Sequence, residues 1–235
     1  MKIAPHKPEL VVDELSIVLL GVFNPTIFQP MWFARQDLLR GSEAEMAKID
    51  IVHQDVSIFS AEWLVVQVTR DRFSAVTRAD AYKSHLCDLV QGVFARLSHT
   101  PVYQMGINVT TRIRFRDEKD WHSFGHFVVP KSPWAKVLDR PGMSSVHVRG
   151  ERSDGNVGHV LVSIDPDFHT RTDVLLRLND HFDLPKGEPN NAATFVAMLT
   201  KLYEESVTNA AAAASQLVDN FLKIDDVDSG ALGRP

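Results

Sequence analysis

Two histidines, His122 and His126, lie four residues apart in a segment that we expect to be helical. One helical turn would bring both imidazoles to the same side, where they could bind one metal ion. The segment reads His-Ser-Phe-Gly-His and lacks the glutamate that follows the first histidine in zinc proteases. The apolar stripe of this helix, formed by Trp121, Phe124 and Val128, points in another direction. We therefore expect solvated or rim histidines and assign no metal ligand.

A second candidate is Asp180, in the run Asn-Asp-His-Phe-Asp that begins at Asn179. Alternation along a strand would place Asp180 on one face with the apolar residues Leu176, Leu178 and Phe182. A carboxylate on an apolar face is costly unless it is hydrogen-bonded or protonated. Asp180 would either contact a ligand or act as a general acid or base, or it would receive backbone hydrogen bonds near the end of its strand.

The third candidate is a row of arginines at alternate positions of a predicted strand. Alternation puts their guanidinium groups on one solvent-facing side, with Arg149 or Arg177 of neighbouring strands beside them. Such a row could bind phosphate, a nucleotide or an acidic partner. The alternative is a solvated face whose charges pair with nearby acids. The candidate ligand-binding residues are Arg112, Arg114, Arg116 and Asp180.

The sequence contains none of the short motifs that mark common enzyme classes. Glycine-rich phosphate loops, the Gly-x-Ser-x-Gly turn and Cys-x-x-Cys pairs are all absent. The single cysteine, Cys87, lies beside Leu86 and Val90 on a predicted amphipathic helix, which indicates a core or boundary residue and not a nucleophile. We therefore assign no catalytic residue and no cofactor, and we favour a non-enzymatic protein.

Hydrophobic periodicity predicts an α+β fold with a mostly antiparallel, curved sheet. The elements occur twice in the same order, as a strand, a short helix, three strands and a long helix. The two pseudo-repeats would join edge to edge, with both long helices on one face. The expected organisation is an extended N-terminus at 1–14, a first half at 15–100, a second half at 101–189, a long helix at 190–224 and a disordered tail at 225–235.

Three segments carry the strongest patterns. Residues 15–23 are mostly apolar, which predicts a strand buried on both faces. Residues 80–98 have apolar side chains at helical spacing. Residues 103–115 alternate between apolar and polar side chains, which predicts one strand with a single wet face. This strand would span roughly 45 Å, so we expect it to bend, with Gly106 as the expected point.

The last predicted helix covers residues 191–222 and carries apolar residues at heptad spacing. Its distal part would dock another helix, in a homodimer or a larger assembly. Alternatively, the helix would break near Asn209 and fold back on its own core. The expected partner-binding residues are Tyr203, Val207, Leu217 and Phe221.

Composition and charge exclude several classes of partner. The 235 residues carry a net charge of −5 and a pI of about 6.0, which argues against general binding to nucleic acid or anionic membranes. The longest apolar stretch, residues 17–23, is too short to cross a bilayer, and the first ten residues do not resemble a signal peptide. One cysteine fits a reducing compartment. We expect a cytoplasmic protein without membrane or nucleic-acid partners.

Three runs, GVFNPTIFQPMWF (21–33), DEKDWHSFGHFVVPKSPW (117–134) and LRLNDHF (176–182), resemble a sporadically distributed family of bacterial proteins of similar length without an established activity. The resemblance implies no catalytic residue. The scattered occurrence of the family implies an accessory role, such as defence against phage.

These features together predict a non-enzymatic binding or scaffold protein, a subunit of a homo-oligomer or of a larger bacterial complex. The alternative is a small-molecule or nucleotide-phosphate binder, or an enzyme. It would use the arginine-lined face and Asp180, with the ligand held between the helices and the sheet.

Overall fold

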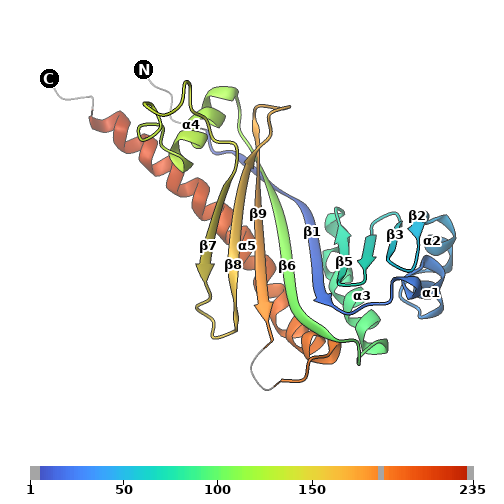
Figure 1. Cartoon of the computed structure of the whole chain (residues 1–235). Helices are drawn as coiled ribbons and strands as arrows, with labels where there is room; N and C mark the ends of the chain where they lie inside the picture. The colour runs from blue at the N-terminus through green and yellow to red at the C-terminus, as the bar shows by residue number, and fades with distance from the viewer. Residues whose placement is uncertain (1–5, 185–187, 232–235) are drawn as a thin grey trace.

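The computed structural model describes residues 6–184 and 188–231, which form one nine-stranded antiparallel sheet with helices packed on it (Figure 1). This confirms the predicted α+β class. The first half contains β1 (Glu9–Gly21), α1 (Pro30–Arg35), α2 (Gly41–Met46), β2 (Lys48–Val52), β3 (Val56–Ser60), β4 (Val65–Thr69), β5 (Arg72–Thr77) and α3 (Lys83–Arg96). The second half contains β6 (Val102–Arg114), α4 (Glu118–Val128), β7 (Val146–Glu151), β8 (Gly158–Pro166), β9 (Asp173–Asp183) and α5 (Ala192–Ala231).

The two halves meet at the centre of the sheet, whose strand order is β2-β3-β4-β5-β1-β6-β9-β8-β7. Strands β1 and β6 pair along their length, with Ile17 opposite Ile107, and both side chains are fully buried. Counted outward from this pair, β1 corresponds to β6, β5 to β9 and β4 to β8, and α3 follows β5 along the chain as α5 follows β9. The first half departs from the repeat by an additional short helix and an additional edge strand, β2.

Helices α3 and α5 lie on the same face of the sheet (Figure 1) and pack against each other. The face of β1 and β6 that they cover carries Leu15, Ile17 and Leu19 from one strand and Met105 and Val109 from the other, all buried. Burial of one such side chain stabilises the fold by roughly 1.5–3 kcal/mol. The shared core therefore binds the two halves into one unit.

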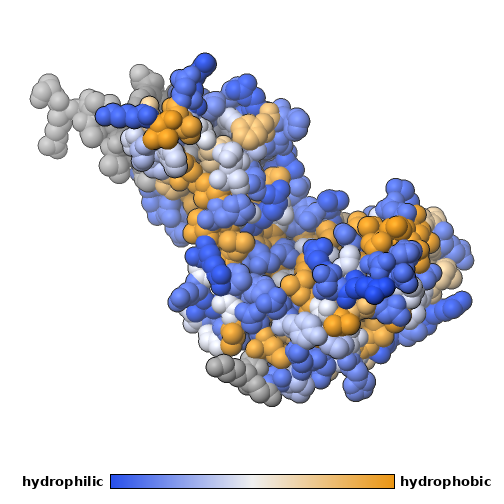
Figure 2. Space-filling view, in the orientation of Figure 1, coloured by the Kyte–Doolittle hydropathy of each residue, from blue (hydrophilic) through white to orange (hydrophobic). Residues whose placement is uncertain are grey.

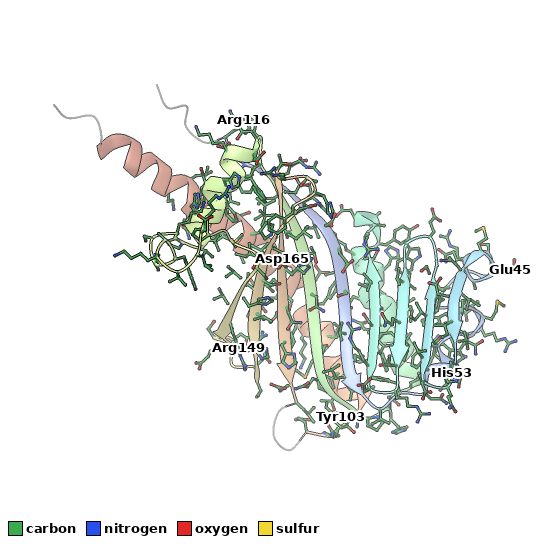
Figure 3. The ribbon with its side chains drawn as sticks, turned by 45° about the horizontal axis from the view of Figure 1, so that its top comes forward. Glu45, His53, Tyr103, Arg116, Arg149 and Asp165 are labelled. Carbon is green, nitrogen blue, oxygen red and sulfur yellow. The ribbon has the colours of Figure 1, made fainter. Side chains whose placement is uncertain are left out.

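The opposite face of the central strands is open, and Figure 3 shows it with its side chains. Strand β1 was expected to be buried on both faces, and this is wrong. Val18 and Leu20 point to the open face and are half-buried. No second layer of helices covers this face in the described part of the chain. Only the neighbouring side chains of the curved sheet shield Val18 and Leu20, so their burial is partial.

Strand β6 has the predicted alternation, with Met105, Ile107, Val109 and Ile113 buried on the helix side. The register between β1 and β6 shifts between Val12 and Glu14. One extra residue thus lies in β1 at Asp13, opposite the distal part of β6. A second shift lies between Leu20 and Gly21, and the pairing at Gly106 is regular. A bulge re-aims the side chain of the extra residue, and here that side chain is a carboxylate.

Helix α5 begins after Asn191, whose side chain accepts a hydrogen bond from the backbone N–H of Thr194 (3.1 Å). The helix is continuous past Asn209 and ends at Ala231. The helix therefore overlaps residues 225–231 of the expected tail, and the disorder expected for this tail stays a prediction. Residues 232–235 lie outside the described part of the chain.

The four side chains expected to bind a partner pack on the core of their own chain. Tyr203 is buried, and its hydroxyl donates a hydrogen bond to the backbone carbonyl of Lys83 at the start of α3. Phe221 is also buried, while Val207 and Leu217 are half-buried. The heptad spacing matches α5 to its own sheet and helices, and the assignment of these four residues to a partner stays a prediction.

The two edges of the sheet, β2 and β7, are short. All five residues of β2 are exposed, including Ile49 and Ile51. Strand β2 begins with the charged Lys48, and its pairing with β3 shifts register between Ile49 and Ile51. Both features hinder the addition of further strands to this edge of the sheet.

None of the helices in the described part of the chain is both long and apolar enough to cross a membrane.

We expect Phe221→Ala to lower the free energy of unfolding by about 3 kcal/mol, the usual cost of removing a buried phenylalanine. The ring lies within 6.1 Å, centroid to centroid, of Phe115, Phe124 and Phe127. Chemical denaturation followed by tryptophan fluorescence measures the loss. Asn220→Ala, at an exposed neighbouring position, is the control. A change below about 1 kcal/mol would show that Phe221 does not belong to this core.

Candidate functional site

Asp180 lies on the helix-covered face of β9, where the chain itself satisfies its charge. Its carboxylate forms an ion pair with Arg152 and accepts a hydrogen bond from Ser206 Oγ of α5 (2.6 Å). Both charged side chains are more than 90% buried, and the guanidinium group of Arg152 lies 3.9 Å from the centre of the Phe182 ring. This cluster joins the β7–β8 turn, β9 and α5.

The matching position in the first half shows that the sheet itself does not require a charge here. Ile17 faces Ala75 across β1 and β5, and Ile107 faces Asp180 across β6 and β9. Asp180 thus replaces a small apolar residue of the repeat. Arg152 and Ser206 thus hold both carboxylate oxygens of Asp180 in a structural ion pair, and its role in ligand binding stays a prediction.

Arg152 also pairs with Asp154 in the same turn. This hydrogen bond holds the pKa of the Asp154 carboxyl well below its usual range. The guanidinium group therefore bridges two carboxylates, one buried and one nearer the surface.

The arginine row is neutralised by carboxylates. Arg112 donates to Asp13 (2.9 Å) and Asp173 (3.2 Å), and Asp167 lies 3.7 Å away. The bulge in β1 places Asp13 at this position. Hydrogen bonds to Asp13 and Asp173 raise the pKa of Arg112, so this guanidinium group remains charged and occupied.

The other two arginines are more exposed and also paired. Arg114 lies 3.4 Å from Glu9, and Arg116 lies 3.2 Å from Asp117. Arg112 and Arg114 stand on the open face of β6 and Arg116 lies beyond its end, whereas Asp180 stands on the helix-covered face of β9. The structure therefore does not bring the arginine row and Asp180 into one site between helices and sheet.

His122 and His126 are exposed on α4, as the position of the apolar stripe predicts. His122 Nε2 lies 3.3 Å from a Glu118 carboxylate oxygen. Partial burial lowers the pKa of His126, and the charges of Lys131 and His122 lower it further. Among the described residues, the two histidines form no three-ligand group with another histidine, cysteine or acid. They lie instead at the rim of a pocket.

This pocket, of about 640 Å³, lies between α4, the segment 129–145 and the adjoining ends of β8 and β9. Its walls include Trp121, Trp134, Leu138, Met143 and Phe168. Trp121 is buried and donates a hydrogen bond from its indole N–H to the backbone carbonyl of Asp173 (3.0 Å). Trp134, Leu138 and Phe168 are 45%, 54% and 60% exposed. The pocket thus combines a fixed wall with exposed apolar side chains.

Figure 2 shows apolar surface gathered at two ends of the molecule, beside α4 and over the β2–β3 region. The polar groups around the first patch are mainly basic. Lys131, Arg140 and the two histidines of α4 line the pocket. Lys131 forms no ion pair within the described ranges, 6–184 and 188–231. Arg140 is paired with the neighbouring Asp139 (3.6 Å), so Lys131 is the unpaired cation at the mouth among the described residues.

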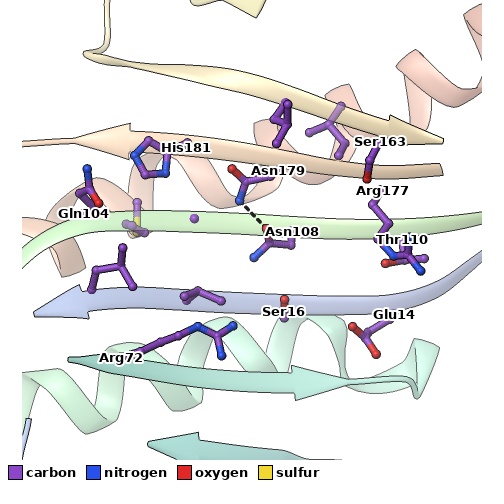
Figure 4. A pocket seen from close by; sticks show the side chains of 16 residues that line it. Glu14, Ser16, Arg72, Gln104, Asn108, Thr110, Ser163, Arg177, Asn179 and His181 are labelled. Atoms are coloured by element: carbon purple, nitrogen blue, oxygen red, sulfur yellow. Dashed lines mark hydrogen bonds between the residues drawn. The ribbon is translucent and has the colours of Figure 1, made fainter. Parts of the chain in front are cut away.

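A second, more polar hollow of about 470 Å³ lies on the open face, over β1, β6, β9 and β8 (Figure 4). Asn179 donates a hydrogen bond to Asn108 across its floor. Gly106 keeps this floor open, since a Cβ atom there would lie 2.8 Å from the Asn179 amide nitrogen. Arg177 is paired with Asp165, but Arg72 points into the hollow without an ion pair to any described residue.

Cys87 is a core residue. Its side chain is buried on α3, and burial raises the pKa of the thiol to about 12. A thiol of this kind is protonated at neutral pH and is a poor nucleophile.

A comparison with models of known protein families finds none that matches this chain, and a comparison with curated proteins finds no relative. The function must therefore be argued from the geometry.

Sequence reasoning missed the apolar pocket and the partner of Asp180. A signal for the pocket was present, because Trp134 stands in the polar run Lys-Ser-Pro-Trp, where a tryptophan has no place in a core pattern. No local signal identifies Arg152, since 28 residues separate it from Asp180 and their contact depends on the β8–β9 register.

We expect Arg152→Met to lower the free energy of unfolding by about 3 kcal/mol, because it leaves Asp180 as an unpaired buried charge. The second substitution, Asp180→Ala, installs the alanine that the first half has at the matching position, Ala75. Added to Arg152→Met, it should restore at least about 1 kcal/mol of the lost stability. Urea denaturation of both variants provides the test, with the exposed Arg149→Met as control. A double variant less stable than Arg152→Met would contradict the ion-pair account.

We expect Cys87 to react with a thiol reagent at pH 8 at least about a hundredfold faster after unfolding than in the native protein. The buried thiol has only a small thiolate fraction, whereas an unfolded cysteine has a pKa near 8.5. Absorbance kinetics with Ellman's reagent, with and without denaturant, measure the ratio. Equal rates would show that Cys87 is accessible in the native state.

Proposed function

We propose that this protein is a non-enzymatic binding or scaffold protein that docks a protein partner on the apolar pocket beside α4. The observation that carries the proposal is the exposure of Trp134, Leu138 and Phe168 around a pocket of about 640 Å³. Contiguous exposed apolar surface on a folded domain is typical of an interaction site. Tryptophan is among the residues that contribute most to binding energy at such sites.

The pocket also indicates the chemistry of its partner. Its apolar walls suit a large apolar side chain, because burial between Trp121 and Trp134 removes apolar surface from water on both molecules. Lys131 and Arg140 at the mouth favour neighbouring acidic side chains. We therefore propose a protein segment that presents an apolar anchor flanked by acidic residues.

The partner is best explained as a different protein within a larger complex. Between Ala192 and Lys223, every large apolar side chain of α5 is buried or half-buried, so the described outer face of this helix offers small and polar residues. The second apolar patch, over β2 and β3, lies at the far end of the sheet (Figure 2). Joining it to the pocket of another copy would give a head-to-tail contact, which forms an open filament unless its rotation closes a ring.

The alternative of a nucleotide-phosphate binder has less support. Arg112, Arg114 and Arg116 are paired with carboxylates, and Asp180 is paired with Arg152. An incoming phosphate would have to compete with these carboxylates for the guanidinium groups.

Photocrosslinking tests the proposal. A photoreactive phenylalanine analogue at Trp134 should give one adduct of defined mass in cells that make the protein, because the partner lies against this side chain. The same analogue at Ala212, an exposed position on α5, should give none. An adduct of twice the chain mass would show self-association and contradict a different partner.

Two further measurements complete this experiment. Trp134→Ala with Leu138→Ala should weaken binding of the crosslinked partner by about thirtyfold or more, the effect of removing a central anchor of about 2 kcal/mol. Both positions are exposed, so the unfolding midpoint should change little. Unchanged affinity in this variant, or the absence of an adduct at position 134, would reject the pocket as a docking site.

A further inference from the structure

Two histidines and an aspartate meet on the open face at the end of β8 and β9 that lies away from the apolar pocket. His159 and His181 stand directly opposite each other, with ring centroids 4.5 Å apart. Asp183 follows on the same face of β9, and its Oδ1 lies 3.3 Å from His181 Nε2. One ligand atom from each residue lies within 4.8 Å of the other two.

The backbone draws the two strands together at this point. Gly158 precedes His159 with a φ of 140°, and a Cβ atom there would lie 2.0 Å from the His181 carbonyl oxygen. Only glycine fits both the angle and the contact. The opposed imidazoles therefore rest on a rigid and closely paired part of the sheet.

The internal repeat shows that the sheet does not need histidines here. Val76 faces Ser16 across β5 and β1, as His181 faces Gly106 across β9 and β6. Val65 then pairs with Val76 as His159 pairs with His181. A valine pair thus fills the matching position, so packing alone does not explain the histidine pair.

Asp183 also departs from the repeat. Its counterpart is Arg78, which pairs with Glu14 of β1, whereas Asp183 accepts a hydrogen bond from Gln104 Nε2 of β6 (2.8 Å). The second half therefore has a carboxylate, held by a neutral amide, where the first half has a cation. Hydrogen bonds of this kind orient metal-binding carboxylates.

The neighbouring strand β7 contributes a further acidic side chain. Glu151, opposite His159 in β7, adds a negative charge to this corner of the sheet.

We propose that His159, His181 and Asp183 bind one divalent transition-metal ion. Two imidazoles and one carboxylate suit Zn²⁺ and related ions, and Mg²⁺ and Ca²⁺ prefer all-oxygen ligands. Three protein ligands leave at least one coordination position, which water or a donor group of a bound molecule completes. His181 also lines the polar hollow of the open face (Figure 4), so a ligand in this hollow has access to the ion.

Calorimetric titration with Zn²⁺ of protein freed of metal by chelator dialysis tests the proposal. The native chain should bind one ion. His159→Val with His181→Val, which installs the pair of the first half, should weaken binding by at least about tenfold, and so should Gln104→Leu through loss of the hydrogen bond to Asp183. Titration with Co²⁺ should give the visible absorption bands of a nitrogen–oxygen site.

The matched control is His122→Ala with His126→Ala, which removes the other closely spaced histidines of the chain. It should leave the affinity unchanged. Absence of Zn²⁺ binding by the native chain, or binding lost in this control and kept in the valine variant, would overturn the proposal. If circular dichroism shows that the valine variant is unfolded, Asp183→Asn replaces it, because Asp183 is partly exposed and its change is less disruptive. Unchanged Zn²⁺ affinity of Asp183→Asn would then reject the three-ligand site.

Discussion

The antiparallel pairing of β1 with β6 is the constraint on which the rest of the structure depends. It joins the halves through the backbone at Ile17 and Ile107, so that the two sheets form one surface and α3 and α5 share one core. The register also decides which side chains face the helices and which face the open side. A slip of one residue would exchange the two faces. The bulge at Asp13 shifts the register by one residue and places the Asp13 carboxylate beside Arg112.

The two halves have the same architecture but differ in chemistry. In the first half, the positions next to the central strand hold Ala75 and Val76. In the second half, the corresponding positions hold Asp180 and His181. The apolar pocket also belongs to the second half, because α4 and the segment that follows it build its walls. The second half thus carries the buried ion pair, the histidine pair and the apolar pocket, whereas the first half carries exposed apolar side chains over β2 and β3.

Local patterns predict the parts of this fold that depend on neighbouring residues. The alternation of 103–115 gave β6, and Asp117 caps α4 through a hydrogen bond from the Asp120 N–H (3.0 Å). The pairing of Arg152 with Asp180 depends on the β8–β9 register, and no local pattern contains it.

The spacing of Tyr203 and Phe221 predicts a helical stripe, and in the structure this stripe packs on the sheet and helices of its own chain. A heptad stripe looks the same whether it meets another chain or its own sheet. The apolar run of β1 led to a wrong prediction of burial for a similar reason. In the sequence, Val18 and Leu20 look like residues buried between two layers. In the structure, only the curvature of the sheet and neighbouring side chains cover them, and they are half-buried.

The position of α5 has a consequence for synthesis of the chain. This helix packs on α3 of the first half and on β6 and β9 of the second, and Phe221 near its end contacts α4. Helix α5 follows both halves of the sheet in the chain, so it leaves the ribosome after them and closes the core of both halves. Until then, the nascent sheet has an uncovered apolar face, with Leu15, Ile17 and Ile107 still open on one side. The synthesis and docking of α5 are thus the steps that cover this apolar face.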